Sequence, residues 1–197
     1  MTDTLLITRA MPERVREAAE ARFDVTLFGE ERPLTLEEAR DALADYDAIM
    51  PTLGDPFRAE AFEGVSPRCR VLANFGAGYN HIDTAAAKAA GIAVTNTPGA
   101  VTDATADIAV TLILMAARRA SEGERLVRSG AWTGWMPTQL LGMHVTGKTV
   151  GIIGMGRIGK AVARRCHHGF GMRVVFHNRS RVEDADLPAE QLAGLHA

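Results

Sequence analysis

A glycine-rich segment in the second half of the chain constrains the fold most strongly. An apolar run ending at Ile153 leads into Gly154–Gly159 (GMGRIG), and a segment of small and basic residues that favours a helix begins at Lys160. A strand that turns directly into a helix leaves unpaired N–H groups and partial positive charge at the helix N-terminus, which favours an anion. Because a second apolar strand follows at 173–177, the G-x-G-x-x-G spacing predicts a dinucleotide-binding βαβ unit.

The three glycines of this motif have different expected roles. Gly154 allows the tight turn, Gly156 allows a pyrophosphate to approach the backbone, and Gly159 allows the helix to pack closely on the strand. An ordinary glycine-rich turn without a ligand is the alternative, and the strand–turn–helix context argues against it.

The residues after the second strand indicate which dinucleotide binds. An NAD site has Asp or Glu about 20 residues after the glycines, where it bonds the ribose hydroxyls. Here Asn178 stands at that point, followed by Arg179, Ser180 and Arg181. Asn does not repel a 2′-phosphate, and Arg can bind one through two hydrogen bonds. We therefore expect NADP(H), with NAD(H) as the alternative if the two arginines are only solvated loop charges.

Composition places the chain among ordinary globular proteins. It has 197 residues, of which 47% are hydrophobic and 23% charged, with a formal net charge of −2. The small net charge predicts no general attraction to nucleic acid or to an anionic membrane surface. No signal peptide or membrane-spanning run is expected, and Cys69 and Cys166 form no disulfide framework, so we expect a cytoplasmic protein with reduced thiols.

The first half of the chain alternates strands with helices. Pro12 is expected to open one helix, a capping box of Thr35 and Glu38 a second, and Asp83 a third that ends before Gly91. The expected strands are 4–8, 24–28, 47–50, 70–73 and 92–95. This α/β order predicts a parallel sheet covered on both faces.

The segment Asn96–Gly99 interrupts this rhythm and is expected to be a domain junction. After it, the pattern predicts one long helix, about 102–127, which we expect to be a buried core or interface helix. The segment 130–147 is expected to be irregular, and its Trp132 and Trp135 are expected to be covered, with a second subunit as one candidate.

A second motif, Asn74–Asp83 (NFGAGYNHID), follows the fourth strand. Ligands of parallel α/β sheets bind outside the carboxyl ends of the strands, and the N–H groups of a Gly-Ala-Gly turn there are able to hold a carboxylate. From this segment alone, a tight turn without a ligand is equally compatible.

Together these motifs resemble the D-isomer-specific 2-hydroxyacid dehydrogenase family, and its glyoxylate and hydroxypyruvate reductases in particular. The motifs that carry the resemblance are 74–83, 96–107 (NTPGAVTDATAD) and the glycine-rich stretch through Ser180. The resemblance implies a flavodoxin-like substrate domain at 1–98, followed by the N-terminal part of a Rossmann cofactor domain at 99–197. It also implies a homodimer, with the segment 132–142 in the contact.

The resemblance further implies roles for individual residues. The amides of Ala77 and Gly78 would hold the substrate carboxylate, with Leu53 and Asn74 near the pocket. Thr105 would lie against the nicotinamide end of the cofactor. Arg157 and Ile158 would cover the pyrophosphate beside the glycines.

The implied reaction is hydride transfer from the nicotinamide to a small 2-oxo acid such as glyoxylate or hydroxypyruvate, giving the D-2-hydroxy acid. In the family an Arg polarises the carbonyl and a His oriented by a Glu supplies the proton, and all three lie in the second half of the cofactor domain. The chain stops at Ala197, where we expect only the start of a helix beyond the second Rossmann strand, so we expect no catalytic residue within it.

None of the six histidines is expected to replace this acid. His81 lies beside the substrate turn and is expected to be structural, and no metal-ligand spacing is present. Two alternatives stay open. One is an NAD-dependent relative similar to phosphoglycerate or formate dehydrogenases, and the other is a dinucleotide-binding fragment or sensor without turnover.

Overall fold

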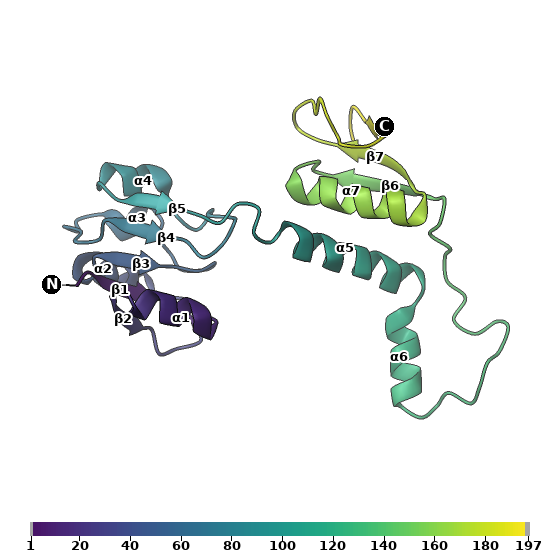
Figure 1. The fold of residues 1–197 in the computed structure, drawn as a ribbon, viewed down its shortest axis with the longest axis horizontal. Coiled ribbons are helices and arrows are strands. Elements are labelled where there is room, and N and C mark those ends of the chain that lie inside the picture. Colours follow the sequence, from purple (N-terminus) through teal and green to yellow (C-terminus); the bar gives the residue numbers. More distant parts are fainter. Residues whose placement is uncertain (1, 196–197) are drawn as a thin grey trace. The chain divides into compact units, whose positions relative to one another are not determined.

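The computed structural model describes residues 2–195, and the chain divides into two compact units, Met1–Ala100 and Val101–Ala197. Figure 1 shows the elements of each unit along the chain. Both units place helices on parallel sheets, which confirms the expected α/β class.

The first unit contains a five-stranded parallel sheet in the order β2-β1-β3-β4-β5. Its strands are β1 Thr4–Ile7, β2 Asp24–Leu27, β3 Ala48–Met50, β4 Val71–Ala73 and β5 Ala93–Thr95. The strand order reverses direction at β1, as in doubly wound folds of the flavodoxin type.

Alternating side chains of these strands supply two hydrophobic clusters, because successive residues of a strand point to opposite faces. Leu6, Ile49 and Leu72 lie in the cluster shared with α2 (Leu36–Asp45), α3 (Ala59–Phe62) and α4 (Thr84–Ala89). Leu5 and Ile7 lie in the cluster of the opposite face, shared with α1 (Glu13–Glu20). The sequence pattern missed α3, since four residues are too few for a helical period to be recognised.

Two predicted helix starts are confirmed. The Thr35 hydroxyl accepts a hydrogen bond from Glu38 N at 3.2 Å, and Thr35 N donates to Glu38 Oε2 at 2.7 Å, which completes the capping box of α2. Asp83 Oδ1 accepts hydrogen bonds from the first amides of α4, those of Ala85 and Ala86. Gly91 has φ +76, as a left-handed residue after a helix requires.

The second unit contains the parallel sheet β6-β7-β8, made of β6 Thr149–Ile153, β7 Arg173–His177 and β8 Ala189–Gln191. Helix α7 (Arg157–Phe170) packs on one face of this sheet, and α5 (Thr102–Ala117) packs on α7 (Figure 1). Ala106 of α5 and Ala161 of α7 are both fully buried, which allows this close packing.

The prediction of one long helix over 102–127 is wrong. The chain instead forms α5 and α6 (Ala120–Arg128), with Arg119 between them at φ +53. Met143 N donates to the free carbonyl of Ala117 at 2.7 Å, and a Cβ on Gly142 would lie 2.4 Å from the same oxygen. A distant segment therefore packs against the end of α5, and the local helical pattern contains no sign of this contact.

The expectation of a helix start after the second Rossmann strand is also wrong, because the strand β8 lies there. Gln191 of β8 holds the preceding loop: its Oε1 accepts from Val182 N at 3.0 Å and its Nε2 donates to Ser180 O at 3.0 Å. These bonds and the parallel pairing of β8 with β7 favour the extended conformation.

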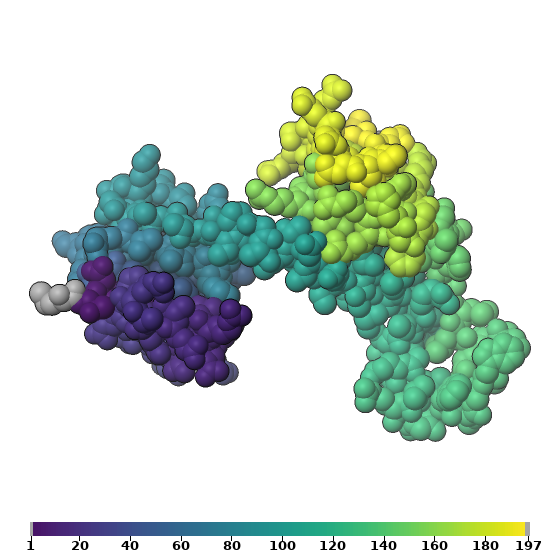
Figure 2. All heavy atoms as spheres, viewed as in Figure 1, coloured from purple at the N-terminus to yellow at the C-terminus, as the bar shows by residue number. Residues whose placement is uncertain are grey.

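Large apolar side chains of α5 and of the segment 130–147 are exposed. Ile108 is 61% and Leu112 58% exposed, so the buried-core interpretation of this helix face is wrong and the interface interpretation stays a prediction. Trp132 and Trp135 are 50% and 80% exposed, and Figure 2 shows α6 and the following segment as an open, projecting loop. Every helix within residues 2–195 is too short or too polar to cross a membrane.

Candidate substrate and cofactor sites

The Gly-Ala-Gly turn after β4 is fixed by two asparagine side chains. Asn74 Nδ2 donates to the carbonyl oxygens of Gly76 at 3.1 Å and Gly78 at 2.9 Å. Asn96 Nδ2, from the end of β5, donates to the carbonyl oxygen of Ala77 at 2.8 Å. All three carbonyl groups of the turn are therefore bonded to side chains beneath it.

This arrangement directs two amide groups to the other side of the turn. No peptide bond is cis in the described residues, and in a trans peptide the C=O of one residue and the N–H of the next point in opposite directions. The N–H groups of Ala77 and Gly78 consequently point away from Asn74 and Asn96. Neither of these N–H groups donates a hydrogen bond within residues 2–195. Two adjacent free amides form a concave site suited to an anion.

Leu53 and Asn74, which the resemblance places near the substrate pocket, both lie beside this turn, and their contact with a substrate stays a prediction. Leu53 is 66% exposed, and its Cδ2 lies 3.9 Å from the position of a Cβ added to Gly76. Asn74 is only 2% exposed, and its Oδ1 has no hydrogen-bond partner in the described part of the chain. Asn74 thus acts on the turn from below, through its amide nitrogen.

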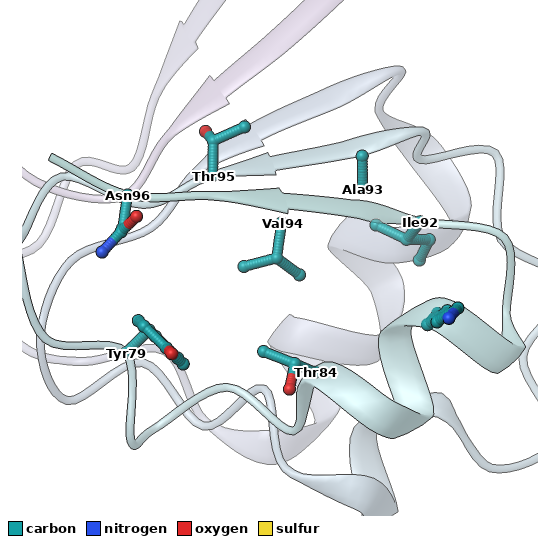
Figure 3. A pocket seen from close by; sticks show the side chains of 8 residues that line it. Tyr79, Thr84, Ile92, Ala93, Val94, Thr95 and Asn96 are labelled. Atoms are coloured by element: carbon teal, nitrogen blue, oxygen red, sulfur yellow. The ribbon is translucent and has the colours of Figure 1, made fainter. Parts of the chain in front are cut away.

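A cavity of about 560 Å³ lies next to the turn, between α4 and β5. Figure 3 shows Tyr79 and Thr84 facing Val94 and Asn96 across it. Its lining includes neither Leu53 nor the residues whose amides are free, so this cavity and the anion site of the turn are different features.

His81 has no role in acid–base chemistry that the structure supports. Burial lowers the pKa of its imidazole, and the nearby charge of Asp55 opposes that effect only in part. Its Nε2 is buried and has no hydrogen-bond partner among the described residues. A lowered pKa and a buried Nε2 make this ring a poor proton donor, since a donor needs access to the reacting atom.

The glycine-rich loop between β6 and α7 has the predicted turn and packing. Gly154 adopts φ +94, where a side chain is strained, and a Cβ on Gly159 would lie 2.1 Å from the Gly154 carbonyl oxygen. A Cβ on Gly156 would meet no atom within 4 Å. Gly154 and Gly159 are therefore required by the fold itself, whereas at Gly156 the fold leaves open space in front of the helix.

The N-terminus of α7 carries no acidic residue in its first turn, and Arg157 and Ile158 are exposed there. Asn178 ties this loop to the end of β7: its Oδ1 accepts from Met155 N at 3.3 Å. Its Nδ2 donates to Ser180 O at 3.0 Å and to Ser180 Oγ at 3.2 Å. From the sequence, Asn178 is notable only because it is not a carboxylate, and its hydrogen bonds to the loop appear only in the structure.

The charged residues after Asn178 are available for a ligand. Arg179 and Arg181 are exposed, and neither has an acidic partner within 4 Å among residues 2–195. Thr105 is exposed on the second turn of α5. Arg165 of α7 donates to Asp103 and Asp107, which fixes the start of α5 on α7.

Other chemistry has little support in residues 2–195. They contain no group of three or more His, Cys, Asp or Glu arranged to hold a metal, and His196 lies outside them. Burial raises the pKa of the Cys69 thiol to about 11, so it is a poor nucleophile.

Comparison with known proteins decides the family. The profile described as D-isomer specific 2-hydroxyacid dehydrogenase, catalytic domain, matches residues 5–186. The chain belongs to this family. Glyoxylate reductase of Thermococcus kodakarensis is 44% identical over 190 residues, which are 94% of this chain and 56% of that protein. Glycerate dehydrogenase of Hyphomicrobium methylovorum is 37% identical over 187 residues, which are 95% of this chain and 58% of that protein.

Solved structures of this family give the same result. A putative D-isomer specific 2-hydroxyacid dehydrogenase from Polaromonas sp. matches with a TM-score of 0.89 and 37% identity, covering 99% of this chain and 61% of that one. A glyoxylate reductase from Paecilomyes thermophila matches with a TM-score of 0.77 and 33% identity, covering 97% and 60%. The chain spans a little over half the length of the relatives that it matches.

Sequence reasoning missed two residues at this edge of the sheet, Asn96 and Asp55. Asn96 had been treated only as part of a domain junction, although it fixes Ala77. Asp55, in the loop after β3, is fully buried, and the sequence analysis attached no role to it. The available signal for Asp55 was a single charged residue in the otherwise uncharged loop 51–57.

Proposed function

We propose that this chain is the N-terminal portion of an NADP(H)-dependent reductase of small 2-oxo acids, with glyoxylate or hydroxypyruvate as substrate and the D-2-hydroxy acid as product. The single observation that carries the proposal is the pair of free amides at Ala77 and Gly78, held outward by Asn74 and Asn96. The names of the relatives, glyoxylate reductase and glycerate dehydrogenase, agree with this substrate class.

In the proposal, the first unit binds the substrate carboxylate. Hydrogen bonds from backbone amides to a carboxylate are charge-assisted and about twice as strong as neutral ones. Because the carbonyls of the turn are already bonded, its two amides do not have to reorganise when the anion arrives. Leu53 adds an apolar wall beside them, and Met1 to Pro98 is accordingly assigned as the substrate domain.

The second unit, from Gly99 to Ala197, is assigned as part of the cofactor domain. The pyrophosphate is proposed to lie over Gly156, against the N-terminal amides of α7, with Arg157 and Ile158 beside it. The exposed Arg179 and Arg181 are proposed to bind the 2′-phosphate of NADP(H), together with Ser180. Thr105 is proposed to lie toward the nicotinamide end of the cofactor.

The cofactor supplies the hydride, and the developing alkoxide of the substrate needs charge stabilisation and a proton. We assign neither task to a residue of this chain. The Nε2 of His81 is buried and the pKa of its imidazole is lowered by burial, so it is a poor proton donor. The proposal therefore places the proton donor in a part of the enzyme that the relatives contain and that this chain does not cover.

The exposed apolar side chains of α5 and of the segment 132–142 are proposed to form a homodimer contact. A stable interface buries roughly 1,200–2,000 Å² in total, with aromatic residues and Met enriched in its core. Leu112→Glu is expected to shift the chain toward monomer in sedimentation experiments, whereas Leu27→Glu, 43% exposed on β2, is the matched control without effect. A wild-type monomer would refute this part of the proposal.

The proposed location of the protein is the cytoplasm, where thiols stay reduced. Both cysteines of the chain are buried and free, which agrees with this proposal.

The test of the function measures NADPH binding by fluorescence and glyoxylate reduction by loss of NADPH absorbance, on the same purified chain. Binding without turnover is the expected result. Turnover by this chain would refute the placement of the proton donor, and absence of NADPH binding would refute the cofactor half of the proposal.

A further inference from the structure

A buried acidic side chain lies among the loops that form the candidate substrate site. Asp55 is 0% exposed, and its Oδ2 accepts hydrogen bonds from Thr8 Oγ1 at 2.5 Å and from Thr52 N at 2.8 Å. Its Oδ1 accepts one from Leu34 N at 3.0 Å and lies 3.6 Å from Arg9 Nη1. A buried carboxylate is costly unless it is paired and hydrogen-bonded, and Asp55 has both kinds of partner.

These partners come from neighbouring strands at one edge of the sheet. Thr8 and Arg9 follow β1, and Asp55 lies in the loop after β3, which pairs with β1 in parallel. The carboxyl ends of parallel strands meet at the same edge, where ligands of α/β sheets bind. Asp55 therefore joins two loops at the edge that also carries the substrate turn.

The same loop is bonded directly to the segment that contains the turn. Phe75 N donates to Pro51 O at 2.9 Å, and Asp83 N donates to Phe57 O at 2.7 Å. Phe57 also forms an isolated parallel bridge with Ile82 and is fully buried. Residues 51–57 are thus fixed to 74–83 at both ends of the turn segment.

We propose that Asp55 is a positioning residue for substrate binding. With Thr8 and Arg9 it holds the loop 51–57, and through that loop it holds Leu53 against the turn whose amides receive the carboxylate. This inference rests on the proposed function of the turn. Asp55 itself has no free oxygen for the substrate, since both oxygens are bonded within the protein.

The chain contains a matched control at the other end of the sheet. Asp47 also binds a threonine and an arginine: its Oδ2 accepts from Thr4 N at 2.8 Å, Thr4 Oγ1 at 2.9 Å and Arg68 Nη2 at 2.8 Å. Asp47 precedes β3, however, and so lies at the amino ends of the strands. A purely structural carboxylate in a similar network is therefore available away from the turn.

The experiment compares Asp55→Asn with Asp47→Asn in the full 197-residue chain. Melting temperature, the NMR amide resonances of Ala77 and Gly78, and affinity for oxamate, a 2-oxo-acid analogue that is not reduced, are measured on both. Both variants are expected to melt lower. Asp55→Asn alone is expected to move the two resonances and to weaken oxamate binding by about tenfold or more, with NADPH affinity unchanged.

Two results would overturn the inference. One is Asp55→Asn with unchanged resonances and oxamate affinity, and the other is an equal effect of Asp47→Asn. If the wild-type chain binds no oxamate, the substrate half of the proposed function fails, while the resonances of the unliganded variants still decide the role of Asp55.

A second pair of variants covers the case in which Asp55→Asn does not fold. Thr8→Val removes one hydrogen bond to Asp55 at nearly constant volume, and Thr8→Ser keeps the hydroxyl. Thr8→Val is expected to move the Ala77 and Gly78 resonances in the unliganded chain, and Thr8→Ser to restore them. Unchanged resonances in Thr8→Val would count against the positioning role.

Discussion

Alanine substitutions in and behind the glycine-rich loop separate what the fold requires from what the ligand requires. A Cβ on Gly159 would lie 2.1 Å from the Gly154 carbonyl oxygen and 3.1 Å from its carbonyl carbon. The closer distance is more than 1 Å inside an ordinary contact of about 3.5 Å, and both atoms belong to the backbone, so α7 has to move away from β6. We expect Gly159→Ala to destabilise the chain by about 1–3 kcal/mol, the usual cost of overpacking.

Gly156→Ala is expected to behave differently. Its Cβ would meet no protein atom within 4 Å, so the melting temperature should stay within about 2 °C of wild type. The same methyl group would occupy the space proposed for the pyrophosphate, and NADPH affinity should fall about tenfold or more. Gly169→Ala, in the open last turn of α7, is the matched control: it should keep NADPH affinity and raise stability by about 0.5–1 kcal/mol.

Urea unfolding followed by circular dichroism gives the stabilities, and NADPH fluorescence titration gives the affinities. The reasoning would be refuted by a Gly159→Ala chain as stable as wild type. It would also be refuted by a Gly156→Ala chain that binds NADPH normally, because the open space over Gly156 would then not hold the pyrophosphate.

Three further predictions concern single side chains. Asn178→Asp places a negative charge beside the proposed 2′-phosphate site, so the ratio of NADPH to NADH affinity should fall about tenfold or more in parallel titrations, and an unchanged ratio would argue against this site. Asp83→Ala removes the cap of α4 and should lower the free energy of unfolding by about 1 kcal/mol in urea, where a loss below the error of the measurement would contradict the capping role. Hydrogen bonds from Arg32 lower the pKa of Glu38 from 4.5 to about 2, so the stability that this carboxylate contributes is present above pH 4.5 and is lost as the pH falls through 2. In Glu38→Gln the urea midpoint should therefore depend less on pH between these two values. A pH profile identical to that of wild type would show that the ion pair contributes nothing to stability.

Much of the architecture follows from local sequence signals. The capping box at Thr35 and the cap at Asp83 act within a few residues, so their hydrogen bonds are formed wherever the helix forms. The turn at Gly154 and the packing at Gly159 depend on a strand and a helix that are adjacent in the chain. The alternation of these elements was enough to predict a parallel sheet, but it did not predict the strand order β2-β1-β3-β4-β5.

The errors have a common physical cause, which is contact between segments far apart in the chain. The helix predicted over 102–127 is interrupted by the left-handed Arg119, and Met143 N, from a distant segment, bonds the carbonyl of Ala117 exposed there. The segment expected to begin a helix forms β8 because it pairs with β7, and Gln191 reaches back to Ser180. No local pattern contains these contacts.

The candidate substrate site shows the same division. The sequence by itself determined that a Gly-Ala-Gly turn follows the fourth strand and that its backbone N–H groups are able to hold a carboxylate. These properties depend only on residue type and order. Only the tertiary structure decided that Asn74 and Asn96 bond all three carbonyls from below, and hence that the amides of Ala77 and Gly78 are the free groups. The tertiary structure likewise brought Asp55 to Thr8 and Arg9, since the parallel pairing of β1 with β3 places their carboxyl ends together.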